Sequence, residues 1–551
     1  MDGELRETEV DGVPVYWVPG ERRMRGSLWF RAGVADEAMP RRGWLHLLEH
    51  LALHGRDSIR APVNGSVSML HTTFDVEGEP NAVAEFLRRL CTWLSEPDFA
   101  DLEHERRVLR AESATRRPGQ VDLHVLWRYG AQGPGVAAYD EYGLHTADPD
   151  RLRALAAQAF ARGNAVLALT GPPPAGLRLP LNDGTRWLAR PAVPCEQPLP
   201  AGFAGVSGGV AMSGALPRSM AGPSLARALR RALETGFRHG TGVGYSAWAS
   251  YEPVDPGTAM LTAGMDILPE ARPTVVGETM AVLRGLRDRG PDPTDLRDEL
   301  DEEVRRLKAE PAETWMPYLA AREVLLGRKV RTRDDLIAEA SATTVEDVRQ
   351  AALTMWSNLL LSVDPEAAGD PQLTWLDGPK PAVGVQTGQQ FKPIGWPVRK
   401  GRLTVCHNNA RIETPAGEVS ADFDQLAIVI AYPDGGRQLI RRDGYQVPIE
   451  PAQWKNGRQA TLAVDAGTSP AVRVAMPARE PDTIPHSTVT WRMKAAYWLK
   501  RPELWILAGL VAVVVVALAT STEIGDILPR AIGVGIAGGL VIFFQRRKDT
   551  R

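Results

Sequence analysis

The chain has 551 residues, of which 44% are apolar and 24% charged, and its formal net charge at pH 7 is −3. This composition indicates a globular protein large enough for several hydrophobic cores, and it excludes a disordered chain. The near-neutral charge argues against a nucleic-acid-binding surface. Three scattered cysteines, Cys91, Cys195 and Cys406, argue against a disulfide framework or a cysteine-based metal site.

Residues 43–53 form an apolar helical run that contains the sequence HLLEH at positions 46–50. Residues three and four apart share a helix face, so His46 and His50 can bind one metal ion while Glu49 points at a water on it. A chain of this composition contains such a pattern by chance about 0.02 times. The order H-x-x-E-H is typical of the inverted zincins. The alternative is a helix whose two histidines are satisfied by hydrogen bonds.

A third ligand is expected from another segment, because a catalytic zinc takes three protein groups and leaves one position open. Residues 99–117 predict a helix, with acidic residues near its start and basic residues near its end. Glu105 and Glu112 lie two turns apart on one face of this helix. It is therefore the expected source of the third ligand.

Four segments together resemble one family: GVADE at 33–37, GWLHLLEH at 43–50, VNGS at 63–66, and the pair Glu105 and Glu112 with six residues between them. The sequence is similar in these segments to the insulinase or pitrilysin family of zinc metallopeptidases, which includes mitochondrial processing peptidase. The resemblance implies a Zn²⁺ cofactor, Glu112 as the third ligand beside His46 and His50, and Glu105 as an outer-shell residue. The interval between His50 and Glu112 is shorter than the family usually shows.

The resemblance extends to Arg238 and Tyr245, which match the spacing of an Arg and a Tyr that the family uses to hold substrate near the metal. The same comparison makes His54 a surface residue rather than a ligand. We interpret His71, His104 and His239 as polar surface or outer-shell groups.

An internal repeat predicts an α+β protein with two homologous α/β half-domains of the pitrilysin type. Each half starts with strand-like segments (13–18 and 27–32; 208–213 and 245–250), continues through amphipathic helices and ends in an apolar strand after an Asn (164–169; 358–363). We expect a catalytic half at 1–172, a Pro-rich hinge at 173–200 and a substrate-binding half at 201–365.

Beyond these halves, a Pro/Gly-rich linker is expected at 366–400 and a small β-rich module at 401–480. Within the module, PDGG at 433–436 predicts a hairpin between strands at 426–432 and 437–441. We assign no chemistry to this module.

The tail predicts a transmembrane hairpin at 503–545, because residues 504–520 and 531–544 are uncharged and close to the length that spans a bilayer. Basic residues precede the first span and follow the second, and the positive-inside rule therefore places both ends of the hairpin in the cytoplasm. The first residues lack the features of a secretory signal. We therefore expect a cell-membrane protein with a cytoplasmic catalytic part.

The function that these features predict is a membrane-anchored zinc metalloendopeptidase that cleaves peptides or small unfolded proteins, with Glu49 as general base. The family builds its peptide chamber from four half-domains, so a homodimer or a heterodimer with a homologous subunit is expected. The alternative is a catalytically silent, membrane-tethered partner or scaffold subunit.

Overall fold

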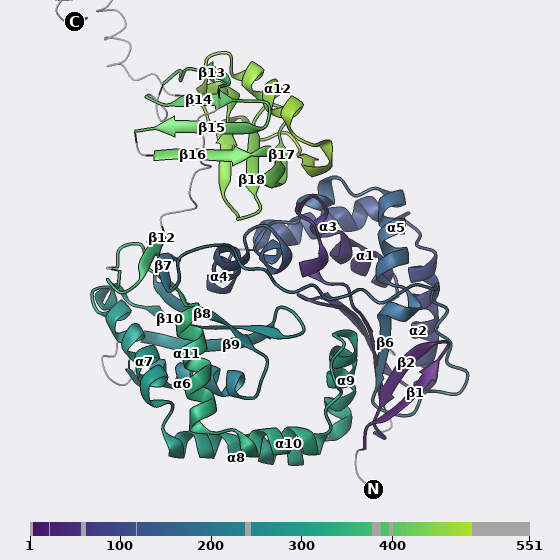
Figure 1. Cartoon of the computed structure of the whole chain (residues 1–551). Coiled ribbons are helices and arrows are strands. Elements are labelled where there is room, and N and C mark those ends of the chain that lie inside the picture. The colour runs from purple at the N-terminus through teal and green to yellow at the C-terminus, as the bar shows by residue number, and fades with distance from the viewer. Residues whose placement is uncertain are drawn as a thin grey trace, which may run out of the picture.

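The computed structural model describes residues 4–20, 23–56, 62–116, 118–236, 244–367, 369–376, 387–395, 400–415 and 417–487. Two α/β halves lie next to each other, and a smaller β-rich module sits against them (Figure 1). The two expected transmembrane spans lie outside the described residues. Within the described part of the chain, no helix combines the length and apolar character that crossing a membrane requires.

The first half is built on a six-stranded sheet in the order β1-β2-β6-β3-β5-β4. Its strands are β1 (Arg6–Val10), β2 (Val13–Trp17), β3 (Met24–Phe30), β4 (Val63–Val67), β5 (Thr72–Gly78) and β6 (Ala165–Leu169). Only the β2–β6 pair is parallel. The strand β6, with sequence AVLAL, is buried throughout, as expected for a central strand covered on both faces.

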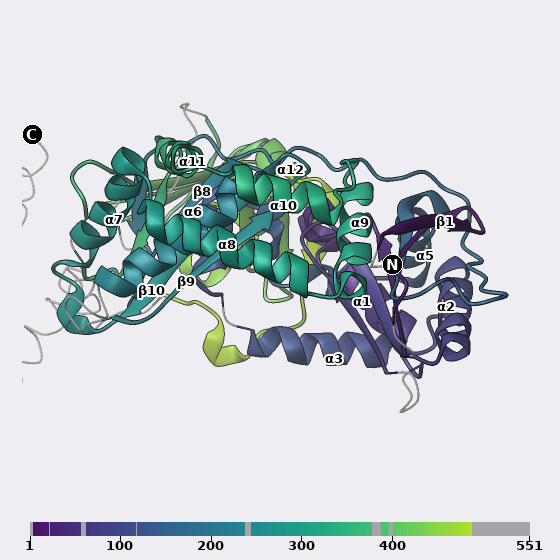
Figure 2. The same ribbon diagram turned by 90° about the horizontal axis from the view of Figure 1, so that it is seen from below.

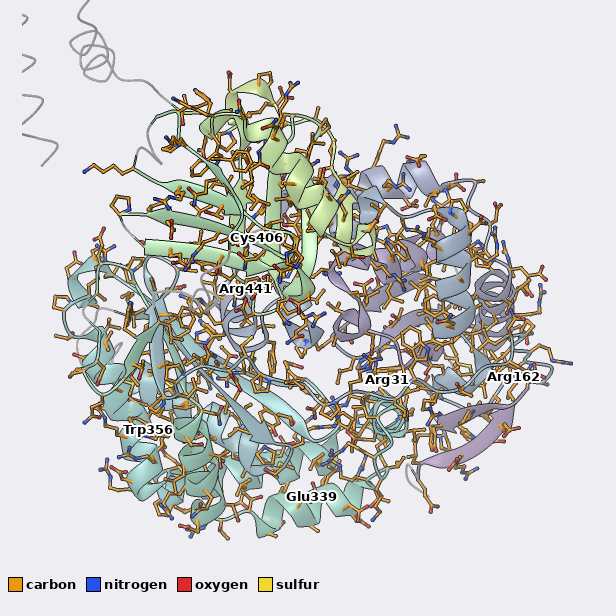
Figure 3. All side chains as sticks on the ribbon, turned by 45° about the horizontal axis from the view of Figure 1, so that its top comes forward. Arg31, Arg162, Glu339, Trp356, Cys406 and Arg441 are labelled. Carbon is orange, nitrogen blue, oxygen red and sulfur yellow. The ribbon has the colours of Figure 1, made fainter. Side chains whose placement is uncertain are left out.

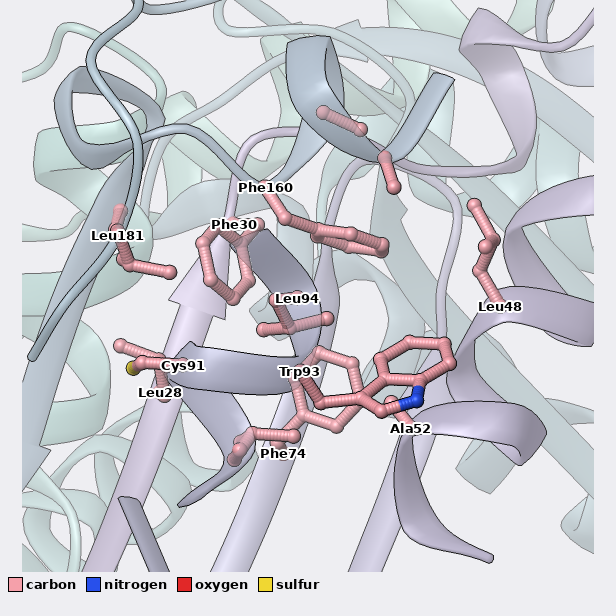
Figure 4. Close-up of a cluster of buried hydrophobic side chains, with 14 of the residues drawn as sticks. Leu28, Phe30, Leu48, Ala52, Phe74, Cys91, Trp93, Leu94, Phe160 and Leu181 are labelled. Atoms are coloured by element: carbon pink, nitrogen blue, oxygen red, sulfur yellow. The ribbon is translucent and has the colours of Figure 1, made fainter. Parts of the chain in front are cut away.

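One face of this sheet is covered by helices of the same half, and the shared core holds the apolar side of α1. The helices are α1 (Trp44–Leu53), α2 (Pro80–Ser95), α3 (Leu102–Thr115) and α5 (Pro149–Ala159). In Figure 4, Leu48 and Ala52 of α1 lie with Phe74, Trp93 and Phe160 in this core. Burial of these side chains fixes the rotation of α1 about its axis, so its polar residues face the other way.

The second half has the strand order β12-β7-β11-β8-β10-β9, in which five strands repeat the arrangement of the first sheet. The edge strand differs, because β12 comes last in the chain and runs parallel to β7, whereas β1 comes first and runs antiparallel to β2. Its strands are β7 (Ala201–Ala204), β8 (Gly209–Pro217), β9 (Gly244–Pro253), β10 (Thr258–Ile267), β11 (Leu360–Val363) and β12 (Thr374–Leu376). Its core helices are α6 (Ala221–Leu233), α7 (Val275–Arg289), α8 (Pro293–Ala309), α10 (Arg333–Ala342) and α11 (Val345–Ser357). The predicted repeat of two mixed α/β halves is confirmed.

The two halves exchange a helix. The helix α4 (Gln120–Tyr129) lies between α3 and α5 of the first half in the chain but packs on the second sheet, where the buried His124 ring lies 2.8 Å from Ser213 Oγ and 2.9 Å from Ser362 Oγ. The helix α9 (Met316–Leu325) does the reverse: its Ala320 and Ala321 pack on the first sheet. Figure 2 shows α9 beside the first half. Each sheet thus has its second apolar face covered by the other half.

The β-rich module starts earlier than the sequence predicts. Its strands are β13 (Gln389–Phe391), β14 (Arg402–Val405), β15 (Asn409–Thr414), β16 (Gly417–Asp422), β17 (Leu426–Ala431), β18 (Arg437–Arg441), β19 (Gln446–Ile449) and β20 (Arg473–Ala475), in two four-stranded sheets with α12 (Gly457–Gly467). The expected linker at 366–400 therefore contains β12, which completes the second sheet, and β13, which pairs with β14. Strands this short form by pairing with neighbouring strands, and the periodicity of the local sequence does not predict them. The predicted hairpin is confirmed as β17 and β18.

The module packs on loops of the first half that lead into α1. Ile428, Ile430 and Ile440 share a buried cluster with Met39 and Val136. The backbone N–H of Ala131 donates to the carbonyl of Arg442 at 2.8 Å. The neighbouring Arg441 is labelled in Figure 3, on the side of the module that faces the two halves.

Candidate active site

Helix α1 presents HLLEH at the surface of the first half because its other face is apolar. Its start is held by a buried carboxylate: Glu37 accepts hydrogen bonds from the backbone N–H of Gly43 at 3.0 Å and of Leu45 at 2.9 Å. These are helix N-terminal donors that would otherwise lack partners. Gly43 has φ of 95°, a left-handed conformation that favours glycine.

His46, Glu49 and His50 converge as the sequence predicts, and their potential ligand atoms lie within 4.8 Å of one another. The Nε2 atoms of His46 and His50 are 4.0 and 3.9 Å from the same oxygen, Oε2 of Glu49. The histidine side chains are partly exposed, 30% and 21%, whereas that of Glu49 is 6% exposed. The two rings are therefore open to an ion from solvent while the carboxylate is shielded.

Each histidine is oriented by a second carboxylate on its other nitrogen. Nδ1 of His46 lies 3.0 Å from Oε1 of Glu141, and Nδ1 of His50 lies 3.1 Å from Oε2 of Glu105. A carboxylate can only accept there, so each neutral ring carries its proton on Nδ1 and leaves Nε2 with a free lone pair. Carboxylate–histidine pairs of this kind are typical of zinc ligands. The donor set therefore fits Zn²⁺.

The pKa shifts follow from burial and from this pairing. Burial raises the pKa of Glu49 above its usual value; His50 and His46 oppose the shift, while Glu112 and Glu105 add to it. Burial is the largest influence on the pKa of His46 and lowers it, but the hydrogen bond to Glu141 and the charges of Glu141 and Glu49 together outweigh burial, so the pKa is raised. A carboxyl with a raised pKa is suited to take and return a proton near neutral pH.

The sequence did not identify Glu141. It stands 95 residues after His46, on a loop, and no local pattern links the two. Arg42 joins this residue to the helix start: its Nη1 is 3.1 Å from Glu141 and 3.2 Å from Glu37. Glu37 belongs to the GVADE segment, but the sequence alone gave it no role.

Glu105 and Glu112 occupy different environments on α3. Glu105 is buried and its carboxylate joins His50, as an outer-shell residue would. Glu112 is exposed and belongs to neither of the compact His/Asp/Glu groups found among the described residues. Its charge nevertheless acts on Glu49, since it raises the pKa of that carboxyl. Glu112 thus lies near enough to influence Glu49, and its role as third ligand stays a prediction.

The edge strand β4 runs beside the cluster. A Cβ added at Gly65 would overlap the Glu49 carboxylate, so the backbone of β4 approaches Glu49 closely and a larger residue at position 65 would displace that side chain. In the described sheet, β4 is the last strand. An extended chain can add to such an edge.

The predicted substrate residues are not tested by the structure. Arg238 lies outside the described residues. Tyr245 belongs to β9, the strand of the second sheet that corresponds to β4, and its side chain lies outside what is described.

Comparison with known proteins places the fold. No protein-family model matches the chain. Coenzyme PQQ synthesis protein F of Pseudomonas putida is 32% identical over 180 residues, which cover 28% of this chain and 23% of that protein. The chain therefore spans less than a quarter of the length of this curated relative.

Two solved structures match over the two halves. A protease from Helicobacter pylori gives a TM-score of 0.55 at 13% identity, covering 66% of this chain and 100% of that one. A peptidase M16 inactive domain from Pseudomonas fluorescens gives 0.54 at 17% identity, covering 67% and 100%. The two halves thus have the fold of M16 peptidases, a fold that occurs in a protease and also in a domain described as inactive.

Proposed function

We propose that the chain is a zinc metallopeptidase whose active site is built on α1. The observation that carries this proposal is the pairing of both Nδ1 atoms with carboxylates, which leaves both Nε2 atoms directed at the Glu49 side chain. A helix whose histidines were merely satisfied by hydrogen bonds would have no need to place two free nitrogens and a buried carboxylate together. The zincin arrangement needs all three.

His46 and His50 would hold the ion, with Glu112 as third ligand and with Glu141 and Glu105 fixing the two rings. Bound zinc would supply a Lewis acid and lower the pKa of a water to about 7. Glu49 is placed to take the proton of the attacking water and to return it to the amine that leaves. Its raised pKa makes Glu49 a stronger base for the first of these transfers.

We propose that the substrate is a peptide or a small unfolded protein bound in extended form along β4. The backbone of an edge strand gives main-chain hydrogen bonds to any sequence, and the close approach at Gly65 sets such a peptide beside Glu49. Arg238 and Tyr245 of the second half are proposed to hold the same peptide from the opposite side.

The remaining parts of the proposal concern assembly and anchoring. With two halves per chain, a second copy or a homologous subunit would complete a chamber of four. The tail at 503–545 would anchor the protein in the cell membrane with its catalytic part in the cytoplasm. Confinement to a plane would raise the effective concentration of the two subunits.

The second candidate function is a catalytically silent partner or scaffold subunit. It is favoured by the similarity to the M16 inactive domain, whose fold match equals that to the protease within 0.01 in TM-score. The intact set His46, Glu49 and His50, with both supporting carboxylates, counts against it.

The test compares the full chain with Glu49→Gln and with the exposed control Glu85→Gln, all purified in detergent. Metal analysis gives zinc per chain, and a library of quenched fluorescent peptides gives cleavage. Gln is nearly isosteric but cannot take a proton, so we expect Glu49→Gln to keep its zinc and to lose cleavage by about 10²–10⁴. Zinc in all three proteins with no cleavage by any would establish the silent-partner function.

A further inference from the structure

A second group of potential metal ligands lies beside the first. His54, His104 and Glu105 place their ligand atoms within 4.8 Å of one another. His54 follows the last residue of α1, and the other two stand in the first turn of α3. Two imidazoles and a carboxylate are a donor set that suits Zn²⁺ and other divalent transition metals.

The two rings meet at one oxygen of Glu105. Oε1 of Glu105 is 2.6 Å from Nδ1 of His54 and 4.0 Å from Nε2 of His104, and the two ring centroids are 5.6 Å apart. The rings are 38% and 55% exposed, whereas the side chain of Glu105 is 8% exposed. A buried anchor is thus flanked by two donors that solvent ions can reach.

Glu105 connects this group to the active site, because its other oxygen, Oε2, lies 3.1 Å from Nδ1 of His50. We propose that His54, His104 and Glu105 form a second, weaker site for a divalent transition-metal ion, through which excess zinc acts on the active site. An ion on Oε1 would draw negative charge away from His50 and weaken its support. Loss of outer-shell support typically costs 10–100-fold in metal affinity or activity.

Binding at this site needs only a change of tautomer at His54. In the neutral ring that donates from Nδ1 to Glu105, the proton moves to Nε2 when Nδ1 takes the ion. Asp101 Oδ2 lies 3.7 Å from that Nε2 and offers its negative charge there. No proton is gained or lost by the ring, so binding is compatible with neutral pH.

His104 separates this proposal from a purely structural interpretation. If His54 served only to orient Glu105 against His50, His104 would have no role. Its Nε2 lies 4.0 Å from Oε1 of Glu105, which is too far for a hydrogen bond. A metal site requires His104. His104→Ala is also a mild change on an exposed residue.

The experiment measures ions per chain on the full-length protein in detergent, stripped with a chelator and titrated with Zn²⁺ or Co²⁺. Equilibrium dialysis with metal analysis gives the stoichiometry, and the Co²⁺ absorption spectrum reports each site. We expect two ions for the wild type, one tight ion for His104→Ala, only the weaker ion for His46→Ala, and two for the exposed control His407→Ala. Saturation of the wild type at one ion, or two ions in His104→Ala, would overturn the proposal.

Cleavage gives the second readout. We expect wild-type cleavage to fall by up to about 10-fold as the second ion binds, and His104→Ala to resist this fall. Equal sensitivity of both proteins would overturn the link to His50. This proposal does not depend on the peptidase activity: if the chain cleaves nothing, the stoichiometry of His104→Ala against the wild type still decides whether the second site exists.

Discussion

The two halves share the arrangement of five strands in their sheets and differ in the helix that follows β3 in the first half and β8 in the second. In the first half this helix is α1, with sequence WLHLLEHLAL; in the second it is α6, with sequence AGPSLARALRRAL. Both bury an apolar face in their own core. The fold therefore provides the position of the site, and the proposed chemistry depends on three residues of one helix and on their supporting carboxylates.

The second half also contains a buried carboxylate, but its partners are different. Glu323 is fully buried, and it lies 2.6 Å from Nη2 of Arg218 and 2.8 Å from Nε of Arg328. Burial opposes its ionisation, yet these arginines hold its pKa below the usual value. A carboxylate paired with arginines holds helices and loops together, whereas Glu49 faces two imidazoles and no arginine is paired with it among the described residues.

The largest effect is expected from removal of the proposed third ligand. This variant tests whether the metal site is shared by α1 and α3. Glu112→Gln removes a negative charge near Glu49, and we expect zinc affinity to fall by more than about 100-fold, beyond the range of outer-shell changes. Metal competition with a chelator measures it, with Glu103→Gln on the same helix as control. Unchanged affinity in Glu112→Gln would show that another residue is the third ligand.

The exchange of helices is tested by His124, which lies between α4 and the second sheet. His124→Ala removes hydrogen bonds to two serines and leaves a cavity, so we expect a loss of about 3 kcal/mol in the free energy of unfolding. Chemical denaturation followed at the second half measures it, with the exposed His486→Ala as control. A loss below about 0.5 kcal/mol would mean that α4 does not hold the second sheet.

The buried His124 should also make the free energy of unfolding depend on pH. Burial, aided by Arg128, lowers the pKa of His124 to about 3, whereas the unfolded chain takes up the proton near 6.5. Between these values the unfolded state binds more protons, so the contribution of His124 to stability is complete above about pH 6.5 and declines as the pH falls toward 3. The difference in unfolding free energy between wild type and His124→Gln should shrink over that range. A constant difference would contradict a neutral, buried His124.

The support of the proposed metal ligands is tested by Glu141, whose Oε1 lies 3.0 Å from Nδ1 of His46. Glu141→Gln keeps a hydrogen-bonding group near His46 but removes the charge, so we expect zinc affinity to fall by about 10–100-fold. The neighbouring exposed residue provides the control Asp140→Asn. The same affinity in both variants would show that Glu141 has no part in orienting His46.

The smallest effect is expected at the other exchanged helix. Ala321 of α9 is fully buried against the first sheet, and Ala321→Leu would overpack this contact by about 1–3 kcal/mol. Thermal unfolding measures the change, with the exposed Ala338→Leu of α10 as control. Equal stability of the two variants would show that α9 docks loosely.

Much of this arrangement was predictable because it is local or repeated. The apolar face of residues 44–53 predicts α1, and the spacing of His46, Glu49 and His50 predicts their convergence; the repeat of strand, helix and Asn-led strand predicts the two halves. The short strands β12 and β13 were missed since each forms only by pairing with a distant neighbour. Glu141 was missed for the same reason.

The sequence by itself determined that His46, Glu49 and His50 converge, because helix periodicity sets which side chains share a face over a few residues. Only the tertiary structure decided what surrounds them: Glu141 and Glu105 on the two Nδ1 atoms, Gly65 of β4 against Glu49, and the exchange of α4 and α9 between halves. These contacts join residues far apart in the chain, and their stability comes from packing and paired charges that no local pattern encodes.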